Sequence, residues 1–223
     1  MIIAFDLDDT LYDESTFIKS GLYHVSKYLY EKYLIKINDS TNFFHYELSK
    51  GRARILDKLL LNYEIYTKKE LRKCLSVYRS HFPDIHLYPE AIQMFDSLKN
   101  IPKYVVTDGN KIVQKNKIKA LNLENYVKKI ILTSNYGLRN SKPSTYCFQK
   151  ICNMEKISPK NLVYIGDDPH KDFVGLKHEE FKTIRLFKGR FKNECLSKEF
   201  EADYKIKSLK EINEEFIKMI LEN

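Results

Sequence analysis

The chain has 223 residues, 43% of them hydrophobic and 30% charged, with a formal net charge of +8. This length suits one domain with a sizeable insertion, and this composition argues against a disordered chain. The lysines are spread along the chain and form no dense basic block. We therefore expect a basic surface that favours anionic substrates and no nucleic-acid partner.

The four cysteines show no Cys-x-x-Cys spacing, which argues against a zinc site and a disulfide framework and favours a cytoplasmic protein. No apolar run approaches the roughly 20 residues that cross a bilayer, so we expect no membrane partner. A predicted strand follows Met1 directly, which argues against a signal peptide. The oligomeric state stays open.

The first predicted element ends in a cluster of acids. Residues 2–5 are an apolar run typical of a strand buried on both faces, and Asp6, Asp8 and Asp9 follow it. Ligands bind at the carboxyl ends of strands in open α/β sheets. Crowded carboxylates repel one another, so we expect a hard divalent cation there. A loop that caps a helix through Asp9 or Thr10 is the alternative, but it explains one acid and not three.

A helical block comes next. Apolar spacing predicts helices at 14–35 and at about 41–63, and the capping box from Thr67 to Glu70 opens a third helix that runs through His81. We expect residues 13–86 to form an inserted helical subdomain, and residues 1–12 and 87–223 to form the core domain that receives it. One long irregular crossover is the alternative, and loop-length statistics disfavour it.

From residue 88 onward, predicted helices and strands alternate. We expect strands at 103–107, 127–133, 162–165 and 183–186, with a weak strand at 203–206. Helices are expected at 89–98, 111–121, 143–154 and 171–178, and a last one opens with the capping box from Ser208 to Glu211. This alternation predicts an α/β fold with a doubly wound parallel sheet.

Three predicted strands end in polar turns, at residues 6–10, 107–110 and 167–172. In a parallel sheet these ends point the same way, so the turns can converge on one site. Lys142 stands before Pro143 at the start of a predicted helix. Each piece alone has an ordinary explanation, such as a helix cap or a surface lysine, but their order and placement together favour a single site.

These motifs resemble those of the haloacid dehalogenase superfamily. The run Asp6 to Thr10 resembles its first motif, Asp-x-Asp-x-Thr, and Thr107-Asp108-Gly109 is similar to its second. Lys142 before Pro143 is similar to the third motif, and the run from Gly166 to Asp172 resembles the fourth. The helical block lies where one large branch inserts its cap. The resemblance implies a Rossmann-like core with an all-helical cap.

The resemblance also implies a phosphoryl-transfer mechanism. Asp6 would attack phosphorus and form an aspartyl-phosphate. Asp8 would protonate the leaving oxygen and then activate water. Lys142 would balance the negative charge, while Thr107 and the backbone N–H of Asp108 would hold phosphoryl oxygens.

The same resemblance implies a Mg²⁺ site. Asp6, the main-chain carbonyl of Asp8 and Asp167 would hold the ion, and Asp172 would orient Lys142 or a metal-bound water. Asp168 directly follows Asp167, so either acid is a candidate for the nearer ligand; we favour Asp167 as the first acid after the glycine.

By this resemblance, the acid at Asp8 favours phosphate ester hydrolysis over dehalogenation. We expect a phosphatase of a small phosphorylated metabolite, with sugar phosphates among the candidates. A phosphomutase or phosphotransferase on the same core stays an alternative, as does a nucleotide or polynucleotide end phosphatase. Arg52 and Arg54, near Gly51 in the second predicted cap helix, are candidates for substrate binding; a solvated helical face is the alternative interpretation.

Overall fold

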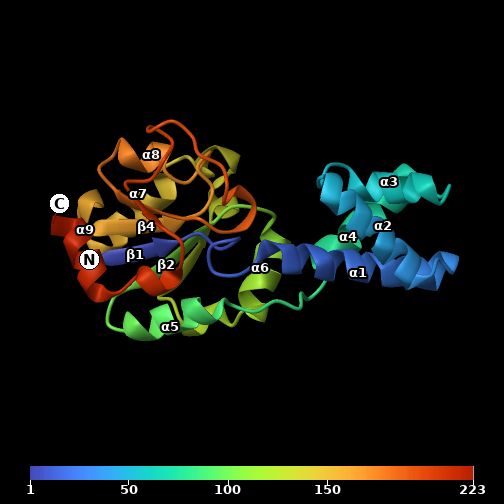
Figure 1. The fold of residues 1–223 in the computed structure, drawn as a ribbon, viewed down its shortest axis with the longest axis horizontal. Helices are drawn as coiled ribbons and strands as arrows, with labels where there is room; N and C mark the ends of the chain where they lie inside the picture. The colour runs from blue at the N-terminus through green and yellow to red at the C-terminus, as the bar shows by residue number, and fades with distance from the viewer. Residues whose placement is uncertain (223) are drawn as a thin grey trace. The chain divides into compact units, whose positions relative to one another are not determined.

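The computed structural model describes residues 1–222 and divides the chain into two compact units (Figure 1). The first, called the α/β unit here, combines Met1–Glu14 with the chain from Ile85 onward. The second, the helical unit, comprises Ser15–Asp84. The chain therefore leaves the α/β unit shortly after its first strand and returns to it after the helical unit.

The α/β unit is built on a parallel sheet. Within residues 1–222 its strand order is β3-β2-β1-β4-β5-β6, and every pairing is parallel. The strands are β1 (Ile2–Phe5), β2 (Lys103–Thr107), β3 (Lys129–Leu132), β4 (Leu162–Gly166), β5 (Lys182–Leu186) and β6 (Tyr204–Ile206). From β1 the chain adds β2 and β3 on one side and then β4 to β6 on the other, so the strand order reverses between β1 and β4. A switch point of this kind is where such sheets bind ligands.

Helices cover both faces of this sheet. Figure 1 shows α5 (Pro89–Ser97) and α6 (Lys111–Ala120) on one face, with α7 (Tyr146–Glu155) and α8 (Val174–Lys177) on the other. The last helix is α9 (Glu214–Glu222). Short 3₁₀ turns lie at Leu123–Asn125, Thr133–Tyr136, Leu138–Asn140, Pro159–Asn161, Gly189–Phe191 and Leu209–Glu211. The prediction of a doubly wound α/β sheet is confirmed.

The apolar runs that predict the strands form the core because both faces of the sheet are covered. All four residues of β1 and all five of β2 and β4 are buried. On one face, Tyr164 of β4 packs edge-on against Phe148 of α7, with ring centroids 4.7 Å apart. The strand that ends at the acids is thus held rigidly at the centre of the sheet.

The helical unit consists of α1 (Glu14–Tyr33), α2 (Ile37–Lys50), α3 (Ile55–Asn62) and α4 (Lys68–Ser80). Helices α1 and α4 pack closely at Gly21, where an added Cβ would lie 2.6 Å from the ring of Tyr78. The same two helices are joined by Glu70, whose carboxylate accepts from Lys32 Nζ (2.5 Å) and the Tyr28 hydroxyl (2.6 Å). Because Gly21 has no side chain, the Tyr78 ring can lie against it, and α1 and α4 can pack this closely.

The prediction of one helix over 41–63 is wrong. The structure has two helices there, α2 and α3, separated by a turn in which Gly51 (φ 131°) and Arg54 (φ 53°) take left-handed conformations. Residues 38–40, which lie in the gap between the first two predicted helices, belong to the first turn of α2. The Ser40 hydroxyl donates to the Ile37 carbonyl (3.0 Å), so this polar side chain is accommodated inside the helix.

Both predicted capping boxes need correction. Thr67 does cap α4 by accepting from the Glu70 N–H (3.0 Å), but the Glu70 side chain turns to α1 instead of closing the box. The box at Ser208 is complete, yet it opens a 3₁₀ turn and the last helix begins only at Glu214. The predicted helix over 171–178 is the single turn α8, and α7 starts at Tyr146 instead of Pro143.

Candidate active site

Three acids meet at the switch point of the sheet. Asp6 follows β1, Asp167 follows β4, and Asp172 belongs to the turn after Asp167. All three are buried, and each offers a carboxylate oxygen within 4.8 Å of the others. The turn brings Asp172 back to the strand because the Asp168 N–H donates to Asp172 Oδ2 (3.0 Å). Gly166 makes room, since a Cβ there would lie 2.4 Å from the same oxygen.

Lys142 is a cation in direct contact with this acid cluster. Its Nζ lies 2.8 Å from Asp6 Oδ1 and 2.8 Å from Asp172 Oδ1, and its side chain is 1% exposed. It also donates to the Tyr164 hydroxyl (2.9 Å). The carboxylate of Asp108 anchors the backbone of this segment by accepting from the Lys142 N–H (3.2 Å). Two loops that follow different strands therefore cooperate to place one ammonium group.

The cluster has more negative charge than Lys142 can offset. Burial raises the pKa of Asp167 to about 9, and nearby Asp172 and Asp6 add to that rise. Burial also raises the pKa of Asp6 to about 6, although the charge of Lys142 opposes the rise. Burial by itself would raise the pKa of Asp172, but the charges of Lys142 and Lys171 and the hydrogen bonds to its carboxylate together lower it. Buried carboxylates in surplus are the donor set that a hard cation such as Mg²⁺ prefers, so these residues fit that ion.

The structure distinguishes the two adjacent acids of the fourth motif. Asp167 is 4% exposed, belongs to the acid cluster and accepts a hydrogen bond from the Thr10 hydroxyl (3.4 Å). Asp168 instead turns onto its own loop, where its Oδ1 accepts from the His170 N–H (3.0 Å). Its other oxygen lies 3.7 Å from Lys171 Nζ. Asp167 is therefore the acid available to a metal.

Asp8 is held by three side chains. Lys117 Nζ lies 2.7 Å from Asp8 Oδ1, which also accepts from the Tyr12 hydroxyl. Gln114 Nε2 donates to Asp8 Oδ2 (3.1 Å) and to Thr107 Oγ1 (2.6 Å). Burial by itself would raise the pKa of Asp8, but Lys117 and these hydrogen bonds lower it.

Sequence analysis missed Gln114 and Lys117. The signal was present, since the two residues stand three apart on the predicted helix 111–121 and therefore face the same side. That helix follows the Thr107 turn directly, so this side could have been expected to face the site.

Arg52 and Arg54 belong to the helical unit, and their predicted helical setting is wrong. Both lie in the connection between α2 and α3. The Arg54 side chain is 75% exposed and pairs with Asp57 (3.2 Å). Their role in substrate binding therefore stays a prediction.

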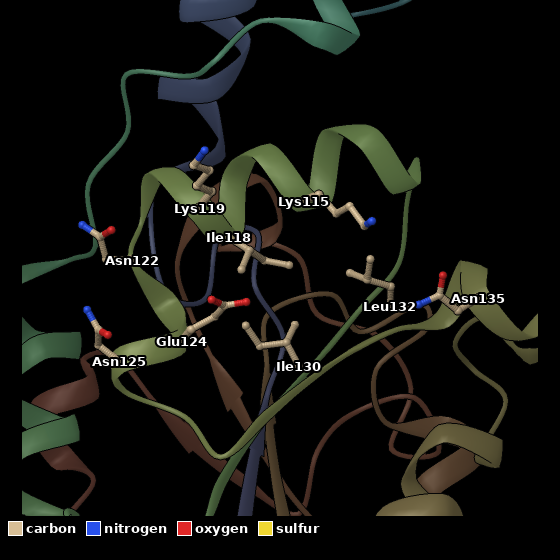
Figure 2. A pocket seen from close by; sticks show the side chains of 9 residues that line it. All are labelled: Lys115, Ile118, Lys119, Asn122, Glu124, Asn125, Ile130, Leu132 and Asn135. Carbon is tan, nitrogen blue, oxygen red and sulfur yellow. The ribbon is translucent and has the colours of Figure 1, made fainter.

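A hollow of about 500 Å³ lies elsewhere in the α/β unit, beside α6 and the edge strand β3 (Figure 2). Lys115 and Lys119 of α6 line it together with Ile130 of β3. None of the clustered acids contributes to its lining. It is therefore separate from the candidate active site.

Comparisons with known proteins identify the family. The family model described as haloacid dehalogenase-like hydrolase matches residues 3–186. A glyceraldehyde 3-phosphate phosphatase of Methanocaldococcus jannaschii is 26% identical, with 94% of each chain covered. A protein of the same name from Pyrococcus furiosus is also 26% identical, with 96% of this chain and 91% of that protein covered. A Bacillus subtilis HAD-hydrolase whose crystal structure is bound to magnesium superimposes with a TM-score of 0.65 at 17% identity, covering 94% of this chain and 95% of the other.

The chain belongs to the haloacid dehalogenase-like hydrolase family. Within that family it is a phosphoric monoester hydrolase of the phosphatase branch. Across residues 1–222, the helices are all too short or too polar to span a membrane.

Proposed function

We propose that the protein is a Mg²⁺-dependent phosphatase that hydrolyses a small sugar phosphate through an aspartyl-phosphate on Asp6. The observation that carries the proposal is the contact between the buried Asp6 carboxylate and Lys142 Nζ (2.8 Å) beside two further acids. Such a site can hold a dianionic phosphoryl group only if cations offset its charge. The same proposal places the protein in the cytoplasm, for which the scattered spacing of its cysteines is the support.

In the first step, an Asp6 oxygen bonds to phosphorus while the bond from phosphorus to the leaving oxygen breaks. The negative charge of the bound phosphoryl group raises the pKa of Asp8, which is lowered in the free protein, so that Asp8 takes up a proton on binding and gives it to the leaving oxygen. Lys142 offsets the charge shared by Asp6 and the phosphoryl group. The Thr107 hydroxyl and the Asp108 N–H donate to phosphoryl oxygens.

In the second step, Asp8 takes a proton from water, whose oxygen attacks phosphorus and releases inorganic phosphate and free Asp6. Asp6, Asp167, Asp172 and the Asp8 carbonyl are the groups proposed to hold Mg²⁺. When bound, the ion would supply positive charge to the phosphoryl oxygens. The carboxylate of Asp172 also orients Lys142 through their 2.8 Å contact.

The names of two relatives support the substrate class. Both are glyceraldehyde 3-phosphate phosphatases, and each matches over more than nine-tenths of this chain. A three-carbon sugar phosphate is therefore the first compound to test. It agrees with the positive net charge, which favours anionic substrates.

The proposal is tested by phosphate release from a panel that contains glyceraldehyde 3-phosphate, other sugar phosphates, nucleotides and nitrophenyl phosphate. We expect turnover that needs Mg²⁺ and is abolished by EDTA. Asp6→Asn should remove turnover, whereas Asp96→Asn, an exposed acid on α5, should leave it unchanged. Full activity of Asp6→Asn would exclude Asp6 as the nucleophile.

We also propose that Arg52 and Arg54 contact the substrate beyond its phosphoryl group. Arg52→Ala and Arg54→Ala should then raise KM for the sugar phosphate and leave hydrolysis of nitrophenyl phosphate nearly unchanged. Equal losses on both substrates would show that the arginines do not recognise the sugar.

A further inference from the structure

We propose that Gln114 and Lys117 of α6 are positioning residues for this reaction. Together they hold both oxygens of the Asp8 carboxylate, and Gln114 turns the Thr107 proton toward the phosphoryl group. The inference rests on the proposed function, because Asp8 and Thr107 take their roles from it. It adds two residues from one helix that none of the four motifs contains.

The two residues approach Asp8 from one side. Lys117 Nζ lies 2.7 Å from Oδ1, and Gln114 Nε2 lies 3.1 Å from Oδ2. With Lys117 and the Tyr12 hydroxyl on Oδ1 and Gln114 on Oδ2, the carboxylate can neither rotate about its last bond nor swing away without losing a contact. General acid–base catalysis depends on such fixed geometry, because the proton must travel between two atoms in hydrogen-bond contact.

The orientation of the Gln114 amide follows from its neighbours. Its nitrogen faces the Asp108 carbonyl oxygen (2.8 Å) and Asp8 Oδ2, and an ionised carboxylate and a carbonyl only accept hydrogen bonds. The group that faces them must therefore be the NH₂. The same nitrogen lies 2.6 Å from Thr107 Oγ1, the shortest of its three contacts. Its two protons serve three acceptors, so one proton is shared, and because an amide nitrogen cannot accept, the Thr107 oxygen accepts from Gln114.

A hydroxyl whose oxygen accepts one hydrogen bond still has its own proton to donate. With Gln114 on the Thr107 oxygen, that proton is left for another acceptor, which in this structure is the Asp108 carbonyl oxygen at 3.4 Å. A phosphoryl oxygen is the acceptor that the proposed reaction brings to this hydroxyl. The Gln114 amide therefore has two effects. It helps to fix the position of the Asp8 carboxylate, and it leaves the Thr107 hydroxyl as a donor for the phosphoryl group.

The burial of Lys117 supports a specific role for its charge. The side chain is 4% exposed, whereas Lys115 and Lys119 of the same helix are exposed and line the hollow beside β3 (Figure 2). Burying an ammonium group is costly unless a partner offsets it, and Asp8 is such a partner. Lys119→Met is therefore a matched control for Lys117→Met.

The test is a double-mutant cycle with Asp8→Asn, Lys117→Met and the double variant. Initial rates are measured on glyceraldehyde 3-phosphate and on nitrophenyl phosphate, and the free energy of unfolding is measured in urea. We expect Lys117→Met to lower kcat on the sugar phosphate about tenfold or more, as part of the effect of a general acid, with KM little changed. The loss on nitrophenyl phosphate should be smaller, because its leaving group needs no proton.

The cycle decides whether Lys117 acts through Asp8. If it does, Lys117→Met causes no further loss of kcat in the Asp8→Asn background. Losses that multiply independently, or equal losses on both substrates, would mean that Lys117 only supports the helix and would overturn the inference. Lys119→Met should leave both rates and the unfolding free energy unchanged.

A second cycle tests the amide with Gln114→Leu and Thr107→Val. We expect each variant to raise KM for both substrates and the double variant to be no worse than Thr107→Val alone. Independent effects would overturn the role of Gln114. If the wild-type protein hydrolyses no phosphate ester of the panel, the proposed function fails and this inference fails with it; an active protein with additive losses overturns the inference alone.

Discussion

Lys142 is the residue on which the charge balance of the site depends. Replacing it by alanine leaves Asp6 and Asp172 facing one another without their shared cation. We expect Lys142→Ala to lower kcat/KM at least about a hundredfold, the effect of removing one donor from a charged transition state. Initial rates on both test substrates measure this loss.

The same variant should unfold more readily, because the loss of one partner leaves buried charge without compensation, at a cost of about 3–5 kcal/mol. The rates are therefore measured at a temperature where circular dichroism shows the variant to be folded. Lys160→Ala, an exposed lysine before β4, is the matched control. A loss of only two- or threefold in the folded variant would reduce Lys142 to an ordinary lysine.

The sequence predicts the location of site residues that follow a strand end better than that of residues that reach the site from a helix. Asp6 and Asp167 follow buried strands, and their convergence follows from the parallel sheet alone. Helical spacing places Lys117 on the same side as Gln114, but only the tertiary structure shows that this side is buried and that Lys117 contacts Asp8. Their catalytic and metal-binding roles remain predictions for the experiments above.

Helix α8 comes close to the backbone beside Lys142 at one glycine. A Cβ on Gly175 would lie 2.0 Å from the backbone carbonyl oxygen of Pro143, the residue after Lys142. Replacing a helical glycine by alanine ordinarily stabilises a protein by about 0.4–1 kcal/mol. Here the clash with backbone reverses the sign, and we expect Gly175→Ala to destabilise the protein by about 1–3 kcal/mol.

Urea unfolding measures this change, and kcat should fall as the Lys142 segment moves. A Gly175→Ala variant that is as stable as the wild-type protein and equally active would show that α8 does not approach this segment so closely.

Strands are the elements that the sequence predicts best. The strand at 103–107 has the expected bounds, because a short apolar run is buried on both sides only in the middle of a sheet that helices cover on both faces. Helix bounds are harder to predict. The apolar spacing continues from Leu48 through Ile55 and Leu59, so the pattern does not reveal that Gly51 and Arg54 turn the chain between α2 and α3.

The stability of the whole molecule should depend on pH and on Mg²⁺ through Asp167. Its pKa rises from 3.8 to about 9 on folding, so between these values the native state keeps a proton that the unfolded state releases. The free energy of unfolding of the metal-free protein should therefore fall as pH rises from 3.8 to about 9. Asp6, with a pKa raised to about 6, contributes in the same direction over a narrower range.

A bound cation offsets the charge of the ionised Asp167 carboxylate. Mg²⁺ should therefore stabilise the protein more at pH 8 than at pH 5. At a hundredfold excess over Kd the stabilisation is about 2.7 kcal/mol. Thermal unfolding with and without Mg²⁺ measures it. Asp167→Asn should remove most of the Mg²⁺ effect and flatten the pH dependence, whereas Asp168→Asn should keep both. The opposite pattern would make Asp168 the metal ligand.

The central place of β1 in the sheet has a consequence for synthesis. Ile3 pairs with Lys103 on one side and with Val163 on the other. During translation, the segment that ends at Asp6 leaves the ribosome well before its neighbours in the sheet, β2 and β4, are made. The helical unit is one continuous stretch of chain that emerges in between. It can therefore fold before β1 has the neighbouring strands with which it pairs. Asp6 thus reaches its native surroundings only after β4 has been synthesised, more than 150 residues further along the chain.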